Sequence, residues 1–258
     1  EQKGHYPRQY NNVVNQQGHY PKAPLQRQSS STPRPLNEVI SSFFSKMHNM
    51  SPTIFYGTLS SIFIFVLWQI PAFSSILQRH FMCSRSNVLH GKRIQSICLS
   101  AISHASFQHL AMNLYGFYRF GSSVKSILSS SYTRCEFWQF CLGAAVFSNL
   151  VFLISSRHGS CIGLSGVTLA LLALHAKVYP ASQLGFVFHF IPIRMPAQYL
   201  LSGLFIISIF GLLTNQGGVA HATHLGGLIY GVLFHELCNN KKFQKLFNKK
   251  QRQRTSSW

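Results

Sequence analysis

The sequence contains no Asp and only four Glu among its 258 residues. Without Asp, a membrane aspartyl protease and a strict Ser-His-Asp triad are both excluded. No carboxylate side chain lies anywhere within residues 137–235. A His-Glu-x-x-His zinc site is excluded as well, because the one His-Glu pair, His235-Glu236, is followed by Asn239 where a second His is required.

Cysteine motifs are also missing. The chain has six Cys, and no two of them form a Cys-x-x-Cys pair, so neither a metal site nor a redox site of that kind is predicted. We therefore expect no metal ion and no other cofactor. The 13 His leave a transporter or a haem-binding membrane protein open as alternative functions. A transporter would favour internal repeats or a carboxylate within the membrane, and the sequence shows neither.

Charged residues make up 10% of the chain, against roughly 25% in ordinary soluble domains. Because a membrane-crossing helix needs about 20 mainly apolar residues, long uncharged runs indicate spans. The sequence therefore predicts an all-α polytopic membrane protein. The runs without Lys, Arg, Asp or Glu are residues 49–78, 94–118, 137–156, 159–176 and 195–235.

The net charge of +19 raises the possibility of nucleic-acid binding. The basic residues, however, gather before position 54 and within 241–254, on either side of the apolar body. Such flanks are typical of an anionic membrane surface, so we expect the lipid bilayer as a partner and no nucleic acid. Residues 1–50 are predicted to be a disordered basic region, and 239–258 a basic tail.

Six transmembrane helices are predicted within a domain at 54–238. An even number of spans puts both termini on one side of the membrane. Most of the 23 Lys and Arg then fall on that same side, and such an unequal distribution of basic residues is typical of membrane proteins. The segment 181–196 alternates like a strand or an interfacial loop. The predicted helices cover 54–73, 104–121, 136–155, from Ser165 to before Pro180, 198–213 and 219–238, with a long connection at 74–97 and a turn at 214–218.

A Gly-Leu-Ser-Gly sequence, residues 163–166, stands where a loop becomes an apolar helix. Amide N–H groups at a helix N-terminus are unpaired and carry partial positive charge. The backbone N–H of Ser165 is thus suited to stabilise an oxyanion that develops at this residue. The alternative is an ordinary helix-capping Ser between Gly163 and Gly166.

A histidine precedes spaced glycines in the last predicted helix. His224, Gly227 and Gly231 share one helical face, where the glycines allow another helix to approach closely. The helix that begins at Ser165 offers small residues at Gly166, Ala170 and Ala173, so docking of the two faces is expected to bring His224 beside Ser165. His221 is the competing base, and a packing face with an incidental His is the alternative interpretation.

A third polar group lies in the second predicted helix. His109 and Asn113 are four residues apart, share a face and can both donate hydrogen bonds, as the stabilisation of an oxyanion requires. The alternative is a simple hydrogen-bonded pair between helices. His104 is expected to order the loop before this helix. Ser148, Asn149 and Gln198 are interpreted as packing or cavity polar residues.

These motifs together resemble the rhomboid family of intramembrane serine proteases, over roughly residues 54–238. The resemblance implies a six-transmembrane-helix rhomboid core with Ser165 as nucleophile and His224 as base. It also implies that His109, Asn113 and the Ser165 N–H stabilise the oxyanion, with Gly163, Gly166, His104, Gly227 and Gly231 supporting the site. Many bacterial members have a Tyr where this chain has Leu169, and a Trp-Arg pair in the first long loop, whereas 74–103 contains no Trp.

Within this family, the run from Val66-Leu67-Trp68-Gln69-Ile70-Pro71 to the His-Leu-Gly-Gly at 224–227 is most similar to the mitochondrial presenilin-associated rhomboid-like branch. Members of that branch usually carry an additional helix before the core, and residues 1–53 predict none. The resemblance implies a serine-type endopeptidase of the mitochondrial inner membrane that cleaves single-span or other transmembrane protein substrates. A secretory-pathway membrane is the alternative location, and a catalytically silent relative that binds membrane proteins is the alternative function.

Overall fold

A computed structural model describes residues 51–130, 135–156, 158–188, 191–214 and 220–240, with scattered positions between 35 and 49. The chain divides into two units, Glu1–Ser42 and Phe43–Trp258, and the second unit contains every element discussed below. The predicted basic regions at 1–50 and 239–258 lie largely outside the described residues, so they remain predictions.

The first helix of the second unit, α3, covers Pro52–Trp68 and is followed by the short turn η1 at Pro71–Phe73 and by α4 at Ser74–His80. Our predicted helix at 54–73 therefore extended too far. Pro71 lacks the N–H that would continue the ladder, and α4 leaves at 103° to α3. The predicted connection at 74–97 accordingly holds helical turns of its own, which are α4, η2 at Ser86–His90 and α5 at Ser96–Leu99, followed by η3 at Ser100–Ile102.

The other helices lie close to their predicted positions, except at the end of α6. This helix continues to Ser130 rather than ending near residue 121, because Val124, Ile127 and Leu128 fall on one buried face. Packing of this face outweighs the weak helix propensity of the Gly-Ser-Ser sequence at 121–123. The remaining helices are α7 at Phe137–Ser155, α8 at Ser165–Val178, α9 at Ala197–Leu213 and α10 at His221–Asn239, and α6 begins at Phe107.

A two-stranded antiparallel hairpin connects α8 to α9. Its strands are β1 at Gln183–Phe188 and β2 at Ile191–Pro196, and the register places Gln183 opposite Pro196. Of the two alternatives for 181–196, the strand is confirmed. The predicted turn at 214–218 lies outside the described residues except for Thr214.

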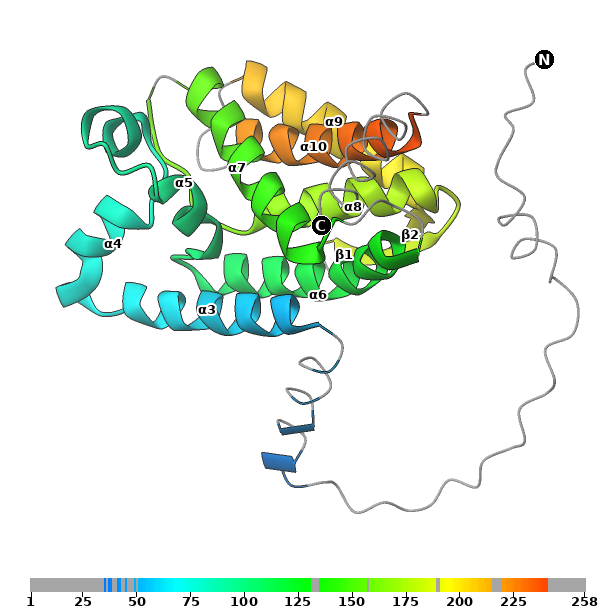
Figure 1. The fold of residues 1–258 in the computed structure, drawn as a ribbon, viewed down its shortest axis with the longest axis horizontal. Helices are drawn as coiled ribbons and strands as arrows, with labels where there is room; N and C mark the ends of the chain where they lie inside the picture. The colour runs from blue at the N-terminus through cyan, green and yellow to red at the C-terminus, as the bar shows by residue number, and fades with distance from the viewer. Residues whose placement is uncertain are drawn as a thin grey trace, which may run out of the picture. The chain divides into compact units, whose positions relative to one another are not determined.

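The middle of the second unit is formed by α8. Helix α10 packs against α7, α8 and α9, while α6 packs against α8 and α3 runs along α6 (Figure 1). Most residues of α8 are buried, including Ala170, Leu171 and Leu174, which are completely enclosed. The N-terminus of α8 is therefore surrounded by several other helices, and Ser165 stands at this point.

By length and composition, Phe137–Ser155 is the one helix in the described part of the chain that could cross a membrane by itself. Pro52–Trp68 and Pro71–His80 would count as a second span only if the bent pair were taken together. Ser165–Val178 and Ala197–Leu213 are apolar but shorter. The helix lengths alone thus do not establish the predicted six spans.

Candidate active site

The loop before Ser165 is held by hydrogen bonds to the segment before α6. The N–H of Gly163 donates to Ser100 O at 2.8 Å, and that of Leu164 donates to His104 Nε2 at 3.3 Å. Gly163 has φ of +120°, a region that other residues rarely adopt. His104, which the sequence predicts to order the loop before α6, also joins that loop to the loop before α8 through this hydrogen bond.

Ser165 is the first residue of α8, and its hydroxyl meets His224 of α10. The distance between Ser165 Oγ and His224 Nε2 is 2.9 Å. The His221 ring lies against Gly211 of α9, and its centroid is 6.3 Å from that of His224. The structure therefore brings Ser165 together with His224 and directs His221 to another helix.

Close contact between α8 and α10 accounts for this pairing. A Cβ added to Gly227 would lie 2.2 Å from Gly166 O, and one added to Gly231 would lie 2.3 Å from Ala170 O. Only glycine permits backbones to approach so closely. The docking of small faces that the sequence predicted is present, and it fixes the separation of Ser165 and His224.

A third helix, α7, contacts the same junction through Ser148. A Cβ on Gly166 would lie 2.3 Å from Ser148 Oγ, and one on Gly226 would lie 2.8 Å from Ser148 Cα. Ser148 Oγ donates to Ala144 O at 2.7 Å, so this buried hydroxyl is satisfied within its own helix. Gly166 is therefore enclosed from two sides, by α7 and by α10.

His109 and Asn113 of α6 lie beside the start of α8. The His109 ring covers Gly163, where an added Cβ would lie 2.5 Å from its Cε1. Asn113 Nδ2 donates to His109 O at 3.0 Å. The Thr168 hydroxyl lies 3.4 Å from Asn113 Oδ1 and 3.1 Å from Ser165 O. The Thr168 hydroxyl has one hydrogen to share between these two acceptors, and the Asn113 NH₂ group, with one hydrogen donated to His109 O, keeps a second for another acceptor.

Asn149 of α7 joins two segments that are distant in the sequence. Its Nδ2 donates to Ile97 O at 2.6 Å and to Ser100 Oγ at 3.0 Å, while its Oδ1 accepts from Cys161 Sγ at 3.4 Å. We interpreted Asn149 only as a packing or cavity polar residue. The available signal was a buried amide in an otherwise apolar helix, but the sequence does not identify its partners.

We expect Asn149→Ala to lower the free energy of unfolding by about 1–3 kcal/mol, because buried partners lose their hydrogen bonds. Thermal unfolding of the detergent-solubilised protein measures this loss. Asn239→Ala is the matched control, since Asn239 is exposed and, among the residues that the structure describes, its side chain bonds only to His235. Equal melting temperatures for the two variants would show that Asn149 does not hold these segments together.

Cys83 and Cys161 join the first long connection to the loop before Ser165. Their backbones exchange hydrogen bonds of 3.0 and 2.9 Å, and both side chains are buried free thiols. The Cys83 thiol donates a hydrogen bond to Cys161, and this bond, reinforced by burial, raises the pKa of Cys83, so this thiol is neutral at physiological pH. The backbone bridge therefore links the first long connection to the loop before Ser165.

The carboxylates near these helices have other partners. The Glu136 side chain caps α7, and Glu236 pairs with Lys177 at 2.8 Å. Neither is placed to orient His224. In the part of the chain that the structure describes, no group of three or more His, Cys, Asp and Glu side chains could hold a metal ion.

The arrangement combines a hydroxyl at a helix N-terminus, a histidine within hydrogen-bond distance and nearby amide donors. A neutral histidine can accept the hydroxyl proton, and the first-turn N–H groups of α8 have no partner inside the helix. Asn113 contributes a further N–H beside them. These groups are suited to attack on a carbonyl and to stabilisation of the resulting oxyanion.

Comparisons with known proteins point to one family. Residues 91–240 match the Rhomboid domain. The presenilin-associated rhomboid-like protein, mitochondrial, of Bos taurus is 28% identical over 187 residues, or 69% of this chain and 47% of that protein. Presenilin-associated rhomboid-like protein A, mitochondrial, of Danio rerio is 29% identical over 216 residues, which are 80% of this chain and 54% of that protein. Rhomboid protein 1, mitochondrial, of Saccharomyces cerevisiae is 29% identical over 181 residues, which are 67% of this chain and 49% of that protein. The chain spans about half the length of these curated relatives.

Proposed function

Because this chain belongs to the rhomboid family, we propose that it is an intramembrane serine endopeptidase with Ser165 as nucleophile and His224 as base. The observation that carries the proposal is the 2.9 Å contact between Ser165 Oγ and His224 Nε2 at the start of a buried helix. A helix-capping serine needs no histidine, whereas a nucleophilic serine needs a base at this distance.

In the proposed reaction, Ser165 Oγ attacks the carbonyl carbon of the scissile peptide as His224 Nε2 takes the hydroxyl proton. His224 then gives that proton to the leaving amine, and an acyl ester remains on Ser165. Water activated by the same histidine hydrolyses the ester and restores both side chains. Since no carboxylate in the described part of the chain is placed to orient His224, we expect turnover to be slower than in a triad protease.

The oxyanion is proposed to accept hydrogen bonds from the Ser165 N–H, from Asn113 Nδ2 and from the His109 ring. Support comes from the position of the His109 ring against Gly163 and from the contact of Asn113 Oδ1 with Thr168 in the first turn of α8. Donors held in place before the reaction stabilise the developing charge without further reorganisation.

Asn113→Ala should lower kcat roughly 100- to 1,000-fold with little change in KM, because one oxyanion donor is lost while the others remain. Steady-state cleavage in proteoliposomes separates the two constants. Thr168→Val keeps the Asn113 amide donor but removes the hydroxyl that contacts Asn113 Oδ1, so the fall in kcat should be smaller than in Asn113→Ala. A kcat that is unchanged in Asn113→Ala would remove this residue from the proposed oxyanion site.

Transmembrane segments of membrane proteins, single-span proteins among them, are the proposed substrates. Helical carbonyls are already hydrogen-bonded, so the scissile segment must unwind before it reaches Ser165, and helix-breaking residues should favour cleavage. The proposed core has six membrane-crossing helices, in which a water-filled cavity among α6, α8 and α10 would lower the cost of their polar residues.

The mitochondrial relatives support the predicted localisation in the mitochondrial inner membrane. The Rhomboid domain is consistent with an integral membrane protein, as the scarcity of charged residues also predicts. The basic flanks are proposed to contact the anionic lipids of this membrane.

Covalent labelling tests the proposed nucleophile directly. A fluorophosphonate should form a phosphonyl ester with Ser165 Oγ and release fluoride, and mass spectrometry of the digested protein should find the adduct on the peptide that contains Ser165. Heat-denatured protein is the control and should not react. An adduct on another serine would contradict the assignment. A chain that binds a substrate without labelling or cleaving would instead be a silent relative.

A further inference from the structure

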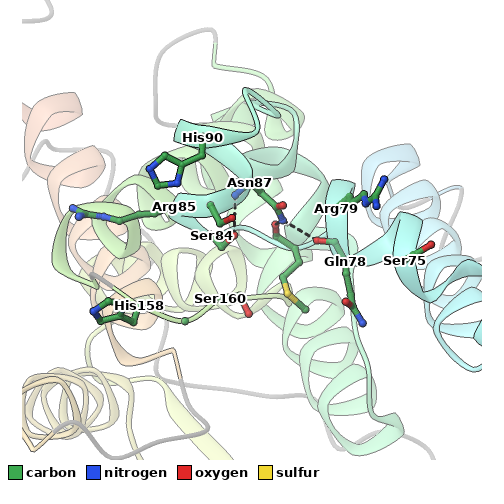
Figure 2. A pocket seen from close by; sticks show the side chains of 12 residues that line it. Ser75, Gln78, Arg79, Ser84, Arg85, Asn87, His90, His158 and Ser160 are labelled. Atoms are coloured by element: carbon green, nitrogen blue, oxygen red, sulfur yellow. Dashed lines mark hydrogen bonds between the residues drawn. The ribbon is translucent and has the colours of Figure 1, made fainter.

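A cavity of about 730 Å³ lies between the first long connection and the loop before α8 (Figure 2). Its lining comes from residues 75–90 on one side and residues 158–160 on the other. The volume is within the range of pockets that hold small molecules. Ser165, His224, His109 and Asn113 do not line it, so the cavity is separate from the candidate active site.

The lining of this cavity is basic. Arg79 and Arg85 line it on opposite sides in Figure 2, with their guanidinium groups pointing away from each other, and His90 and His158 also lie at its edge. None of the lining residues is an acid. Two guanidinium groups without a carboxylate favour an anionic ligand, and arginine is well matched to phosphate oxygens.

Hydrogen bonds hold the walls of the cavity in place. Asn87 Nδ2 donates to Gln78 O at 2.7 Å and to Met82 O at 2.8 Å. Arg85 Nε donates to Leu153 O at 2.7 Å, so its guanidinium is anchored at the end of α7. The site is therefore formed before a ligand arrives, which lowers the entropic cost of binding.

The surroundings of the cavity are apolar and exposed. Ile76 and Leu89 are 54% and 60% exposed, and Ile94 in the same connection is 70% exposed. Since α4 leaves α3 at 103°, it would lie along the membrane surface when α3 crosses the bilayer. Exposed apolar side chains beside basic ones are typical of segments at the boundary between headgroups and acyl chains. The cavity would then open at the depth of the lipid phosphates.

We propose that this cavity binds the phosphate of an anionic phospholipid headgroup, with Arg79 as the phosphate ligand and Arg85 as the residue that holds the wall of the cavity against the end of α7. The exposed apolar residues around it receive the acyl chains. The proposal depends on α3 crossing the bilayer but not on the chemistry of Ser165. A chain without protease activity could therefore still bind the lipid, and a chain that does not bind the lipid could still be a protease.

Native mass spectrometry of the purified full chain in detergent tests the site, with dioleoylphosphatidylglycerol and dioleoylphosphatidylcholine titrated in parallel. The wild-type chain should retain phosphatidylglycerol preferentially. Arg79→Gln should weaken that binding about tenfold, as expected for loss of one charge-assisted hydrogen bond to phosphate. Lys92→Gln removes an equal charge from the same connection without touching the cavity and should bind like the wild type.

Three outcomes would overturn the proposal. Equal affinity for the two lipids would remove the requirement for an anionic headgroup. Equal losses in Arg79→Gln and Lys92→Gln would indicate general electrostatic attraction rather than a site. Displacement of the lipid by millimolar inorganic phosphate would identify a soluble anion as the ligand. Arg79 decides the test because Arg85→Gln should also destabilise the end of α7, which a fall in melting temperature without lipid would show.

Discussion

Ser165→Ala should abolish cleavage of a single-span substrate, with kcat lower by a factor of about 10³ to 10⁶. The variant removes the only atom proposed to attack the scissile carbonyl, while alanine is compatible with the first turn of α8. Cleavage in proteoliposomes, followed by gel analysis of both products, measures the effect. An unchanged melting temperature would show that the loss is chemical rather than structural.

His224→Ala should reduce kcat to a similar level, since two residues that act as one unit are not additive. The double variant should then be no slower than either single variant. His221→Ala is the matched control, because its ring faces Gly211 and makes no contact with Ser165 Oγ. If His221→Ala alone abolishes cleavage, the base has been assigned to the wrong histidine; cleavage that survives in Ser165→Ala excludes the dyad.

Gly227→Val should remove detectable cleavage, a loss of at least about 1,000-fold, and should also lower the melting temperature. Its Cβ would lie 2.2 Å from the Gly166 carbonyl oxygen, a backbone atom that cannot rotate away. Helices α8 and α10 would have to separate, and the 2.9 Å contact between Ser165 and His224 would be lost. A displacement of 1 Å at a catalytic pair costs about 100-fold, and valine requires more than that.

Gly203→Val provides the control for this prediction. Gly203 lies within α9, and a Cβ added there would find no atom within 4 Å. Both substitutions introduce the same β-branched side chain into a helix, so their propensity effects are equal. Gly203→Val should cleave like the wild type. If Gly227→Val does so too, the contact between α8 and α10 does not position the dyad.

Much of the helical framework could be predicted because uncharged runs and turn residues define it. The bounds of α7, α8, α9 and α10 differ from prediction by only a few residues. The glycine spacing in α10 also selected His224 over His221, because small residues in register identify the helix face that another backbone can approach. The hydrogen bond with Ser165 involves that same histidine.

Features that depend on distant contacts could not be predicted. The sequence shows that Asn149 is a polar residue in an apolar helix, but not that its amide binds Ile97 O and Ser100 Oγ. The extension of α6 to Ser130 likewise depends on packing in the core, which local helix propensity does not predict. The bend after Trp68 was signalled by Pro71, but the 103° direction of α4 depends on tertiary structure.

The contacts that Ser148 and Asn149 make have a consequence for judging relatives from sequence. Helix α7 supplies neither the nucleophile nor the base, yet it encloses Gly166 and holds the loop before Ser165 through Ser100 and Cys161. A homologue that keeps both proposed catalytic residues but changes this turn of α7 would lose the contacts that hold Gly166 and the loop before Ser165, yet a motif comparison would still score it as an enzyme. The Ser148-Asn149 pair should therefore be inspected whenever active and silent members are separated by sequence alone.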